Sequence, residues 1–325
     1  MKVFQLAWAS MQPDSNRKLY KFSGPTEYAL QNLENGVIFC QHYSAYNDPF
    51  EFWSNIYEGI PDPKLEPERF LAAASAWGFP ANSVDELMAD RGFFENMEEY
   101  FDECQHYAPP FGAMRQGIRV ACFGSEQDNL LMWSHYGDGL RGFCIVFDEP
   151  SIANADPDGY LFDVAYLQAP PTVDSLVYGI AWDQDWFSQT AIDETTTAIE
   201  FQGRKELQAE IPMYEEAGAE AVRMMHDIWR HAFGTKPAEW SYERERRLLV
   251  QSDRDDELPI LRKYPADAIT QIVVGERMPS DYRRRLEGVL SKNYGSVPIS
   301  TARRSPSTYR LEIERAEVRR RASVE

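Results

Sequence analysis

The sequence predicts an α+β fold in which a mixed or antiparallel β core carries helical insertions. Short strand-like segments recur along the chain without a helix regularly between them, a pattern that argues against a doubly wound fold. Hydrophobic residues make up 43% and aromatic residues 13% of the 325 positions, which is enough for a sizeable buried core. We therefore expect residues 1–325 to form a single α+β domain.

The first expected elements are a strand, a helix and a second strand. Residues 19–22 have the composition of a short strand. The turn that follows ends at Thr26, whose side-chain oxygen can cap a helix over the next residues. Asn35 and Gly36 end that helix, because glycine readily adopts the left-handed conformation at a helix C-terminus. Residues 37–40 then form the second strand.

The rest of the core is expected to consist mainly of further strands. Two apolar strands are expected at 118–123 and 142–147, with one or two helical turns between them at 130–136. An amphipathic helix with basic residues on its outer face is expected at 281–293. The other expected strands, of which the last two pair as a hairpin, are 161–167, 241–251, 269–274, 297–302 and 308–313.

Two helical insertions and a basic tail accompany this core. Residues 55–115 contain 12 Asp or Glu against 4 Lys or Arg, and their apolar residues recur at spacings of three and four. Such an acidic helical insertion is either a solvated surface that maintains solubility or an interaction face. The second helical insertion is expected at 185–233. Residues 302–325 hold 7 Arg against 4 Glu and are expected to form a basic C-terminal tail.

The net charge of −19 restricts the partners of the chain. Phosphate backbones and anionic lipid headgroups repel such a protein, so we expect neither broad nucleic-acid binding nor membrane association. No apolar run approaches the ~20 residues of a membrane-spanning helix, and the N-terminal run is too short for a signal peptide. The cysteines form no CxxC pair, and three of the four lie in apolar stretches as reduced, buried thiols do. Together these features predict a cytoplasmic protein.

The segment 240–250 carries the most informative group of charges. If it is extended, side chains alternate between two faces, so Glu243, Glu245 and Arg247 share one face. Two carboxylates and a guanidinium on one face favour an acid/base site or a site that stabilises a cation. The alternative is an edge strand whose charge pairs are solvated and prevent edge-to-edge association.

A second candidate site is the loop region 124–142. Ser125, Trp133, His135 and Tyr136 are concentrated there between two expected strands, and loops that carry such residues often form binding sites. The alternative for His135 is a buried ring that is bonded to a backbone carbonyl.

A third polar element is the turn at 46–51. Asn47 and Asp48 either hydrogen-bond to their own backbone, as these residue types do in turns, or point into a cleft. Pro49 and Phe50 are expected to have a structural role.

Metal binding is not expected from the histidines and cysteines. His226 and His231 are separated by about 140° around a helix, which prevents shared ligation, and no Cys/His cluster has zinc spacing. A carboxylate-bound magnesium or manganese ion at Asp48, Glu243 or Glu245 is left open. The sequence has no P-loop, GxGxxG or GxSxG motif, which argues against a kinase, a Rossmann dehydrogenase and an α/β-hydrolase.

Several of these segments, in this order, resemble the bacterial family called domain of unknown function 2971. The resemblance covers roughly residues 19–300 apart from the helical insertions. It departs from the family pattern at Gly124, where a serine is usual, and at Leu140, where a histidine is frequent. The segments that carry it are 19–22, 35–36, 47–51, 122–126, 132–136, 142–144 and 242–247.

That family name implies no activity, but the same order of elements also resembles the ADP-ribosyltransferase pattern. The second resemblance implies a split sheet and NAD as a substrate, whose glycosidic bond breaks through an oxocarbenium-like transition state. It implies that Glu245 is the catalytic carboxylate and that Glu243 orients or deprotonates the acceptor. His135 and Tyr136 are then expected to line the nicotinamide pocket, and Lys21 to meet the pyrophosphate. The full set of expected ligand-binding residues is Tyr20, Lys21, Asn47, Asp48, Ser125, Trp133, His135, Tyr136 and Arg247.

Three functions of different classes follow. The first is an NAD-dependent ADP-ribosyltransferase-like enzyme, which takes a small phosphate-bearing ligand and acts as a toxin or phage-defence effector. The second is a metal-dependent hydrolase or nuclease built on Asp48, Glu243 and Glu245. The third is a non-catalytic sensor or partner-binding protein that uses the acidic insertion. The sequence does not identify a macromolecular acceptor.

Overall fold

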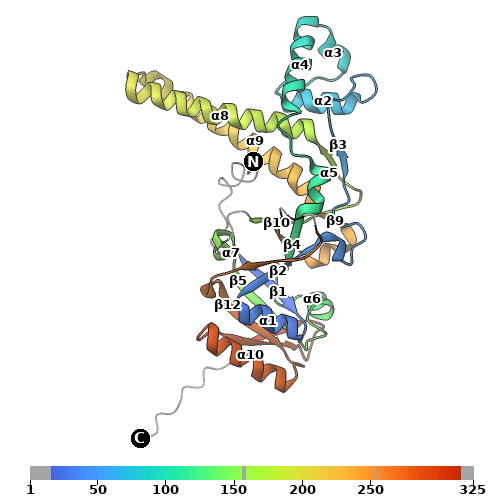
Figure 1. The fold of residues 1–325 in the computed structure, drawn as a ribbon, viewed down its shortest axis with the longest axis vertical. Helices are drawn as coiled ribbons and strands as arrows, with labels where there is room; N and C mark the ends of the chain where they lie inside the picture. Colours follow the sequence, from blue (N-terminus) through green and yellow to red (C-terminus); the bar gives the residue numbers. More distant parts are fainter. Residues whose placement is uncertain (1–15, 156–158, 253, 255, 316–325) are drawn as a thin grey trace. The chain divides into compact units, whose positions relative to one another are not determined.

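The computed structural model describes residues 16–155, 159–252, 254 and 256–315. Helices and mixed β-sheets occur together in it, which confirms the predicted α+β class. The chain divides into two compact units, whose elements are labelled in Figure 1. The first unit contains Phe52–Arg115 and Leu167–Thr235, and the second contains the described residues before Phe52, Gln116–Tyr166 and those after Thr235.

The first unit is mainly helical and contains both expected insertions, 55–115 and 185–233. The second helical segment begins at Ser175 and not at residue 185, because Asp174 caps α8 by accepting a hydrogen bond from the Leu176 N–H. Buried side chains of α2, α3, α4 and α8 form a shared core. The elements are β3 (Asn55–Tyr57), α2 (Pro67–Ala76), α3 (Val84–Met88), α4 (Arg91–Cys104), α5 (Phe111–Met114), β8 (Thr172–Asp174), α8 (Ser175–Gln202), the 3₁₀ helix η3 (Lys205–Ala209) and α9 (Ile211–Phe233).

The second unit is built on two five-stranded sheets. The first sheet has the order β1-β5-β12-β13-β14 and is mixed, because β12 and β13 run parallel while the other neighbours are antiparallel. The second sheet has the order β11-β2-β4-β10-β6 and is antiparallel. The strands of the first are β1 (Lys18–Ser23), β5 (Phe143–Asp148), β12 (Ile269–Gly275), β13 (Ile299–Arg304) and β14 (Leu311–Arg315). Those of the second are β2 (Val37–His42), β4 (Ile118–Phe123), β6 (Gly159–Asp163), β10 (Arg246–Gln251) and β11 (Ile260–Lys263).

The helix α1 (Glu27–Asn35) begins and ends where its terminal residues predict. Thr26 Oγ1 accepts a hydrogen bond from the Ala29 N–H at 3.1 Å, and Gly36 takes the left-handed conformation with φ 62°. The expected basic helix is present as α10 (Ser280–Asn293), which lies next to α1 in Figure 1. The two helices are joined by the Tyr282 hydroxyl, which donates to the Thr26 carbonyl at 2.8 Å.

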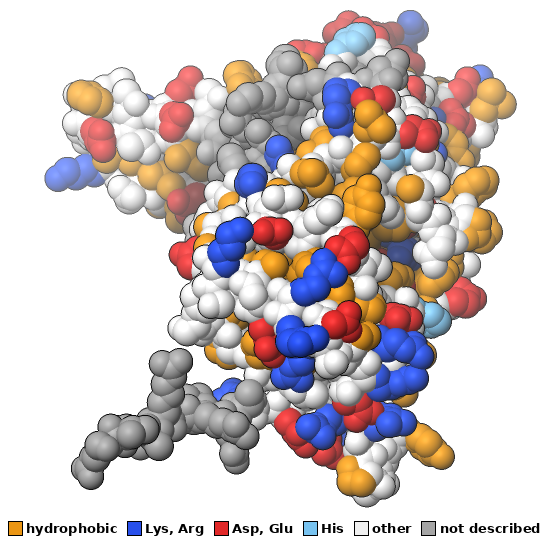
Figure 2. Space-filling view, turned by 60° about the horizontal axis from the view of Figure 1, so that its bottom comes forward, with side chains coloured by type: hydrophobic (Ala, Val, Ile, Leu, Met, Phe, Trp, Pro, Cys, Tyr) orange, Lys and Arg blue, Asp and Glu red, His pale blue; other side chains and the backbone are white. Residues whose placement is uncertain are grey.

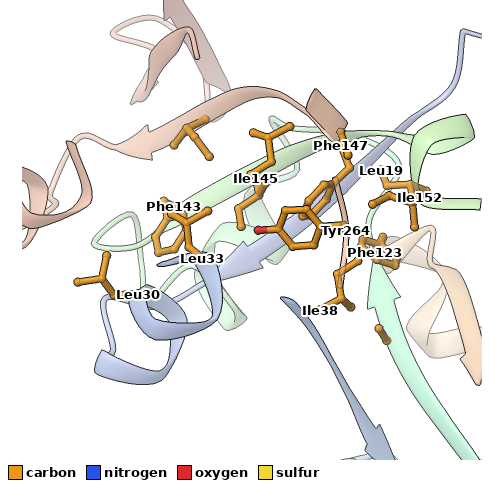
Figure 3. Close-up of a cluster of buried hydrophobic side chains, with 14 of the residues drawn as sticks. Leu19, Leu30, Leu33, Ile38, Phe123, Phe143, Ile145, Phe147, Ile152 and Tyr264 are labelled. Atoms are coloured by element: carbon orange, nitrogen blue, oxygen red, sulfur yellow. The ribbon is translucent and has the colours of Figure 1, made fainter. Parts of the chain in front are cut away.

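A cluster of buried apolar side chains packs α1 against the strands of the second unit. Figure 3 shows Leu30 and Leu33 of α1 near Phe143 of β5, with Ile145 and Phe147 farther along the same strand. Each fully buried side chain of this size stabilises the fold by about 1.5–3 kcal/mol relative to exposure. The cluster therefore holds in place the strands that carry the candidate site.

Two arginines of α10 form ion pairs with neighbouring acids. Arg283 pairs with Glu287 one turn away, and Arg285 pairs with Glu27 of α1. Figure 2 shows this face of the second unit, where Lys and Arg side chains are interspersed with Asp and Glu. Within the described ranges, each helix is too short or too polar to cross a bilayer.

Three expected elements differ in extent from the prediction. The strand expected at 241–251 begins only at Arg246, because Ala238–Glu243 form a 3₁₀ helix, η4, and Arg244 has a φ of 43°. The strand expected at 161–167 is divided into β6 and β7 (Ala165–Leu167). Of the expected tail 302–325, residues 302–315 belong to β13, β14 and their connection, and the others lie outside the described residues.

The expected hairpin of the last two strands is present, since β13 and β14 pair antiparallel. The remaining short elements are η1 (Tyr43–Ala45), η2 (Arg115–Gly117), α6 (Leu130–His135), α7 (Glu149–Ala155), β9 (Thr235–Pro237) and η5 (Ala266–Ala268).

Candidate functional site

A cavity of about 340 Å³ lies within the second unit. Its lining residues come from β1, β2, β4, α6 and the segment before β10, so parts of the chain that are far apart in sequence meet there. Six residues that the sequence singled out are among them: Tyr20, Lys21, Asn47, Tyr136, Glu243 and Glu245.

The backbone before β10 brings the two glutamates to the cavity in a way that alternation along a strand did not predict. The η4 helix ends at Glu243, and Arg244 follows in the left-handed conformation. The Arg244 side chain is exposed and pairs with Glu126, whereas the side chains of Glu243 and Glu245 are only 2% and 3% exposed. Both carboxylates therefore lie together at the cavity, but a tight turn and not alternation along a strand brings them there.

The two glutamates belong to a buried network of ion pairs. Lys236 Nζ lies 2.7 Å from Glu243 Oε2 and 2.5 Å from Glu245 Oε2. Arg247 Nε donates to Glu245 Oε1 at 2.7 Å. The other end of the same guanidinium binds Glu51 through two parallel bonds of 2.5 and 2.9 Å. These five side chains, two cations and three carboxyls, are called the charge network below.

Burial and neighbouring charges together decide the ionisation of this network. Burial alone would raise the pKa of the Glu245 carboxyl, but Arg247 and Lys236 outweigh burial and lower that pKa to about 2. Burial would likewise lower the pKa of Lys236, but Glu245 and the other anionic neighbours raise it. For Glu51 burial prevails over the nearby guanidinium, and the pKa of that carboxyl is raised. At neutral pH Glu245 and Lys236 are therefore both charged.

Tyrosine hydroxyls make further hydrogen bonds to the two glutamate residues. The Tyr136 hydroxyl donates to Glu243 Oε1 at 2.6 Å. The Glu245 N–H donates to the Tyr166 hydroxyl at 2.8 Å. Burial, together with the bond to Glu243, raises the pKa of Tyr136 above its usual value, so this phenol stays protonated and remains a donor.

Lys21 supplies a further cation to the lining from β1. Its Nζ donates to the Cys122 carbonyl at 2.9 Å and lies 5.6 Å from the centre of the Phe123 ring. Neither contact is with an acidic side chain. The ammonium therefore keeps donors for a ligand in the cavity, since one carbonyl uses only one of its three N–H groups.

Two of the other expected ligand-binding residues support the site without lining it. Arg247 is fully buried and holds Glu245, which does line the cavity. Asp48 forms a turn: its Oδ1 accepts from the Phe50 N–H at 2.9 Å, and its carbonyl accepts from the Glu51 N–H at 3.2 Å. This turn fixes the backbone at Glu51, which binds Arg247.

The structure does not bring Ser125, Trp133 or His135 to the cavity lining. Trp133 is fully buried, donates from Nε1 to the Gln127 carbonyl at 2.7 Å and packs edge-on against Phe22. His135 is exposed, so it is neither in the cavity nor a buried ring, and Ser125 is half-buried. The loop region 124–142 therefore contributes Met132 and Tyr136 to the cavity lining.

Several residues of the site were not predicted as such from the sequence. Lys236 and Glu51 belong to the charge network, and Tyr46 and Cys122 line the cavity next to it. Cys122 pairs with Arg247 in the β4–β10 register, and its thiol donates to the Tyr46 hydroxyl at 3.3 Å. The only local signal for Lys236 is its position seven residues before Glu243.

The position that a metal ion between the two glutamates would take is occupied by the ammonium group of Lys236. Lys236 Nζ is within 2.7 Å of an oxygen of Glu243 and of Glu245. Across the residues that the structure describes, no group of three or more His, Cys, Asp or Glu side chains has the arrangement of a metal site.

Residues 132–248 match the family described as "Protein of unknown function (DUF2971)". This match confirms the resemblance to that family expected from the motifs. It spans Tyr136 and the segment with Glu243 and Glu245, but it does not extend to Lys21 or Asn47. No curated protein and no solved structure matches the chain, so the resemblance to ADP-ribosyltransferases stays a prediction.

Proposed function

We propose that the protein is an NAD-consuming enzyme of the ADP-ribosyltransferase type, which breaks the bond between nicotinamide and ribose. The observation that carries this proposal is that Lys21, Tyr136, Glu243 and Glu245 line one cavity although they come from three separate parts of the chain. Each was assigned a role in NAD cleavage by resemblance, and a shared cavity is what those roles require.

The charges of the site suit a reaction that develops positive charge. Cleavage of the glycosidic bond leaves a ribose with oxocarbenium character, which a fixed carboxylate stabilises without reorganisation. Glu245 is ionised and immobilised by two cations. The network contains three carboxyls, Glu51, Glu243 and Glu245, against the two cations Lys236 and Arg247. When all are ionised, one negative charge remains uncompensated beside the cavity.

Glu243 and Lys21 fit two further roles in this reaction. Glu243 is held by the Tyr136 hydroxyl at 2.6 Å and lines the cavity, which suits a group that orients an acceptor. Lys21 is a cation with donors to spare and suits a phosphate oxygen. A cavity of about 340 Å³ is at the small end of ligand sites and suits the nicotinamide-riboside end of NAD.

A metal-dependent hydrolase is less well supported. A divalent ion between Glu243 and Glu245 would lie close to the Lys236 ammonium, and the two cations would repel each other at short range. The proposed role as a toxin or phage-defence effector concerns the acceptor and stays a prediction.

The decisive experiment is incubation of the full chain with NAD labelled on the nicotinamide or on the adenylate, in buffer and in cell lysate. We expect release of nicotinamide by the wild type and a loss of roughly 10²–10³-fold in Glu245→Gln. Glutamine has the shape of glutamate, so this change removes the charge without leaving a cavity. Glu126→Gln is the matched control, because Glu126 pairs with exposed Arg244 and does not line the cavity. Equal release by the wild type and Glu245→Gln, or no release by the wild type under either condition, would overturn the proposal.

A further inference from the structure

Lys236 is the least expected member of the charge network. Its side chain is 4% exposed, it lies in the three-residue strand β9, and its ammonium also faces the Trp240 ring at 5.5 Å. Removing an ammonium group from water costs several kcal/mol unless ion pairs and hydrogen bonds offset the loss. A lysine in such a place therefore has a specific electrostatic task.

The geometry defines that task. Lys236 Nζ is 2.7 Å from Glu243 Oε2 and 2.5 Å from Glu245 Oε2, so those two oxygens are at most 5.2 Å apart, the sum of the two distances. Two buried carboxylates at such a separation do not both ionise near neutral pH unless a cation lies between them, because each opposes the charge of the other. Arg247 is not the cation between Glu243 and Glu245, since its guanidinium binds Glu245 and Glu51.

We propose that Lys236 is a positioning residue, whose ammonium bridges Glu243 and Glu245 and holds both carboxylates ionised and fixed at the wall of the cavity. Its effect on catalysis rests on the proposed function, whereas its effect on ionisation does not. The raised pKa of Lys236 agrees with this role, because an ammonium that bridges two carboxylates loses its proton less readily. When Lys236 is replaced, the two glutamates are therefore expected to bind one proton between them.

The other groups that face these side chains come from every neighbouring element. Most of them keep a fixed charge between pH 5 and 8, so they do not generate the pH signal by themselves. They are Arg247 of β10, Cys122 of β4, Tyr136 next to α6, Tyr166 of β7, Tyr46 after η1, Tyr242 of η4 and Glu51. Glu51 has a raised pKa, so its contribution must be removed by comparing variants that all retain it.

The test is the pH dependence of unfolding for Lys236→Met, measured as the urea midpoint at about pH 5 and about pH 8. Without the ammonium, one carboxyl of the pair has a folded-state pKa above its unfolded value of about 4.3. Such a group contributes stability that is present below the unfolded pKa and is lost as the pH rises through the folded pKa. The urea midpoint of Lys236→Met should therefore lie further below that of the wild type at pH 8 than at pH 5. We expect this difference in midpoint to be at least roughly twice as large at pH 8.

A second variant separates this electrostatic role from simple packing of the lysine chain. Lys236→Met combined with Glu243→Gln removes the like charge, so the double variant should lie closer to the wild type at pH 8 than Lys236→Met alone. A loss that is equal at both pH values and is not relieved by Glu243→Gln would overturn the proposal. If Lys236→Met does not fold at either pH, a folded double variant supports the proposal and an unfolded one refutes it. None of these readouts requires NAD, so they stand apart from the outcome of the NAD assay.

Discussion

Replacing Arg247 with methionine tests whether the charge network is a structural requirement of the second unit. Arg247 is fully buried and binds Glu51 through two bonds of 2.5 and 2.9 Å and Glu245 through one of 2.7 Å. Methionine occupies similar space along the aliphatic part of the side chain but has no donor. The variant therefore leaves Glu51 buried without its guanidinium partner, and Glu245 keeps Lys236 as its cationic neighbour.

Breaking a buried ion pair by removing one partner costs about 3–5 kcal/mol, because the remaining charge stays buried. With a urea dependence of about 3 kcal/mol/M, as expected for a large domain, the urea midpoint of Arg247→Met should fall by roughly 1–1.7 M. Part of this loss should be relieved when Glu51→Gln is added, since the amide carries no charge that needs compensation.

The assay is urea unfolding followed by circular dichroism, together with hydrogen exchange of peptides from β4 and β10, which report on the second unit. Arg244→Met is the matched control, because Arg244 is also an arginine of the same segment but its ion pair with Glu126 is exposed. Exposed pairs contribute about 0–1 kcal/mol. If Arg247→Met loses no more stability than Arg244→Met, the idea of a network that holds the site together is wrong.

Two further predictions concern single contacts of the second unit. Tyr136→Phe removes the 2.6 Å bond to Glu243, a hydrogen bond to a charged group, and should lower the free energy of unfolding by about 1.5–3 kcal/mol; an unchanged urea midpoint would contradict the bond. Gly142→Ala places a Cβ 2.0 Å from the Ser23 carbonyl oxygen, so the backbone must shift and stability should fall by about 1–3 kcal/mol in thermal unfolding. Its control is Gly288→Ala in the exposed middle of α10, where a Cβ meets nothing within 4 Å and where alanine should raise stability by about 0.5–1 kcal/mol; equal effects at both glycines would refute the steric argument.

Elements whose ends are marked by local chemistry could be predicted from the sequence. Thr26 and Gly36 define α1 because a side-chain cap and a left-handed residue act within a few positions of the chain. The same local reasoning failed before β10. Alternation requires an extended backbone, but Arg244 takes a φ of 43°, a conformation that is uncommon for any residue other than glycine. The sequence there contains no glycine or asparagine that would indicate the turn.

The partners of the glutamates could not be predicted, because they depend on the tertiary structure. Glu243 and Glu245 were recognised since two acids near an arginine form a visible pattern. Lys236 and Glu51 carry no such pattern, and they join the network only because the folded chain brings β9 and the turn before Phe52 next to β10. His135 shows the reverse case, since a chemically versatile residue in a promising loop is exposed and outside the cavity.

The network also explains how the second unit can carry two long helical insertions. Glu51 is its last residue before Phe52–Arg115, and Lys236 is its first residue after Leu167–Thr235. Both side chains are held by buried ion pairs inside the second unit, so these ends of the two insertions are fixed there whatever the insertions contain. The entropic cost of closing a connection grows only slowly with its length. We therefore infer that the helical segments tolerate changes in length, whereas the residues that flank them do not tolerate displacement, because moving Glu51 or Lys236 moves a carboxylate of the charge network or its counter-charge.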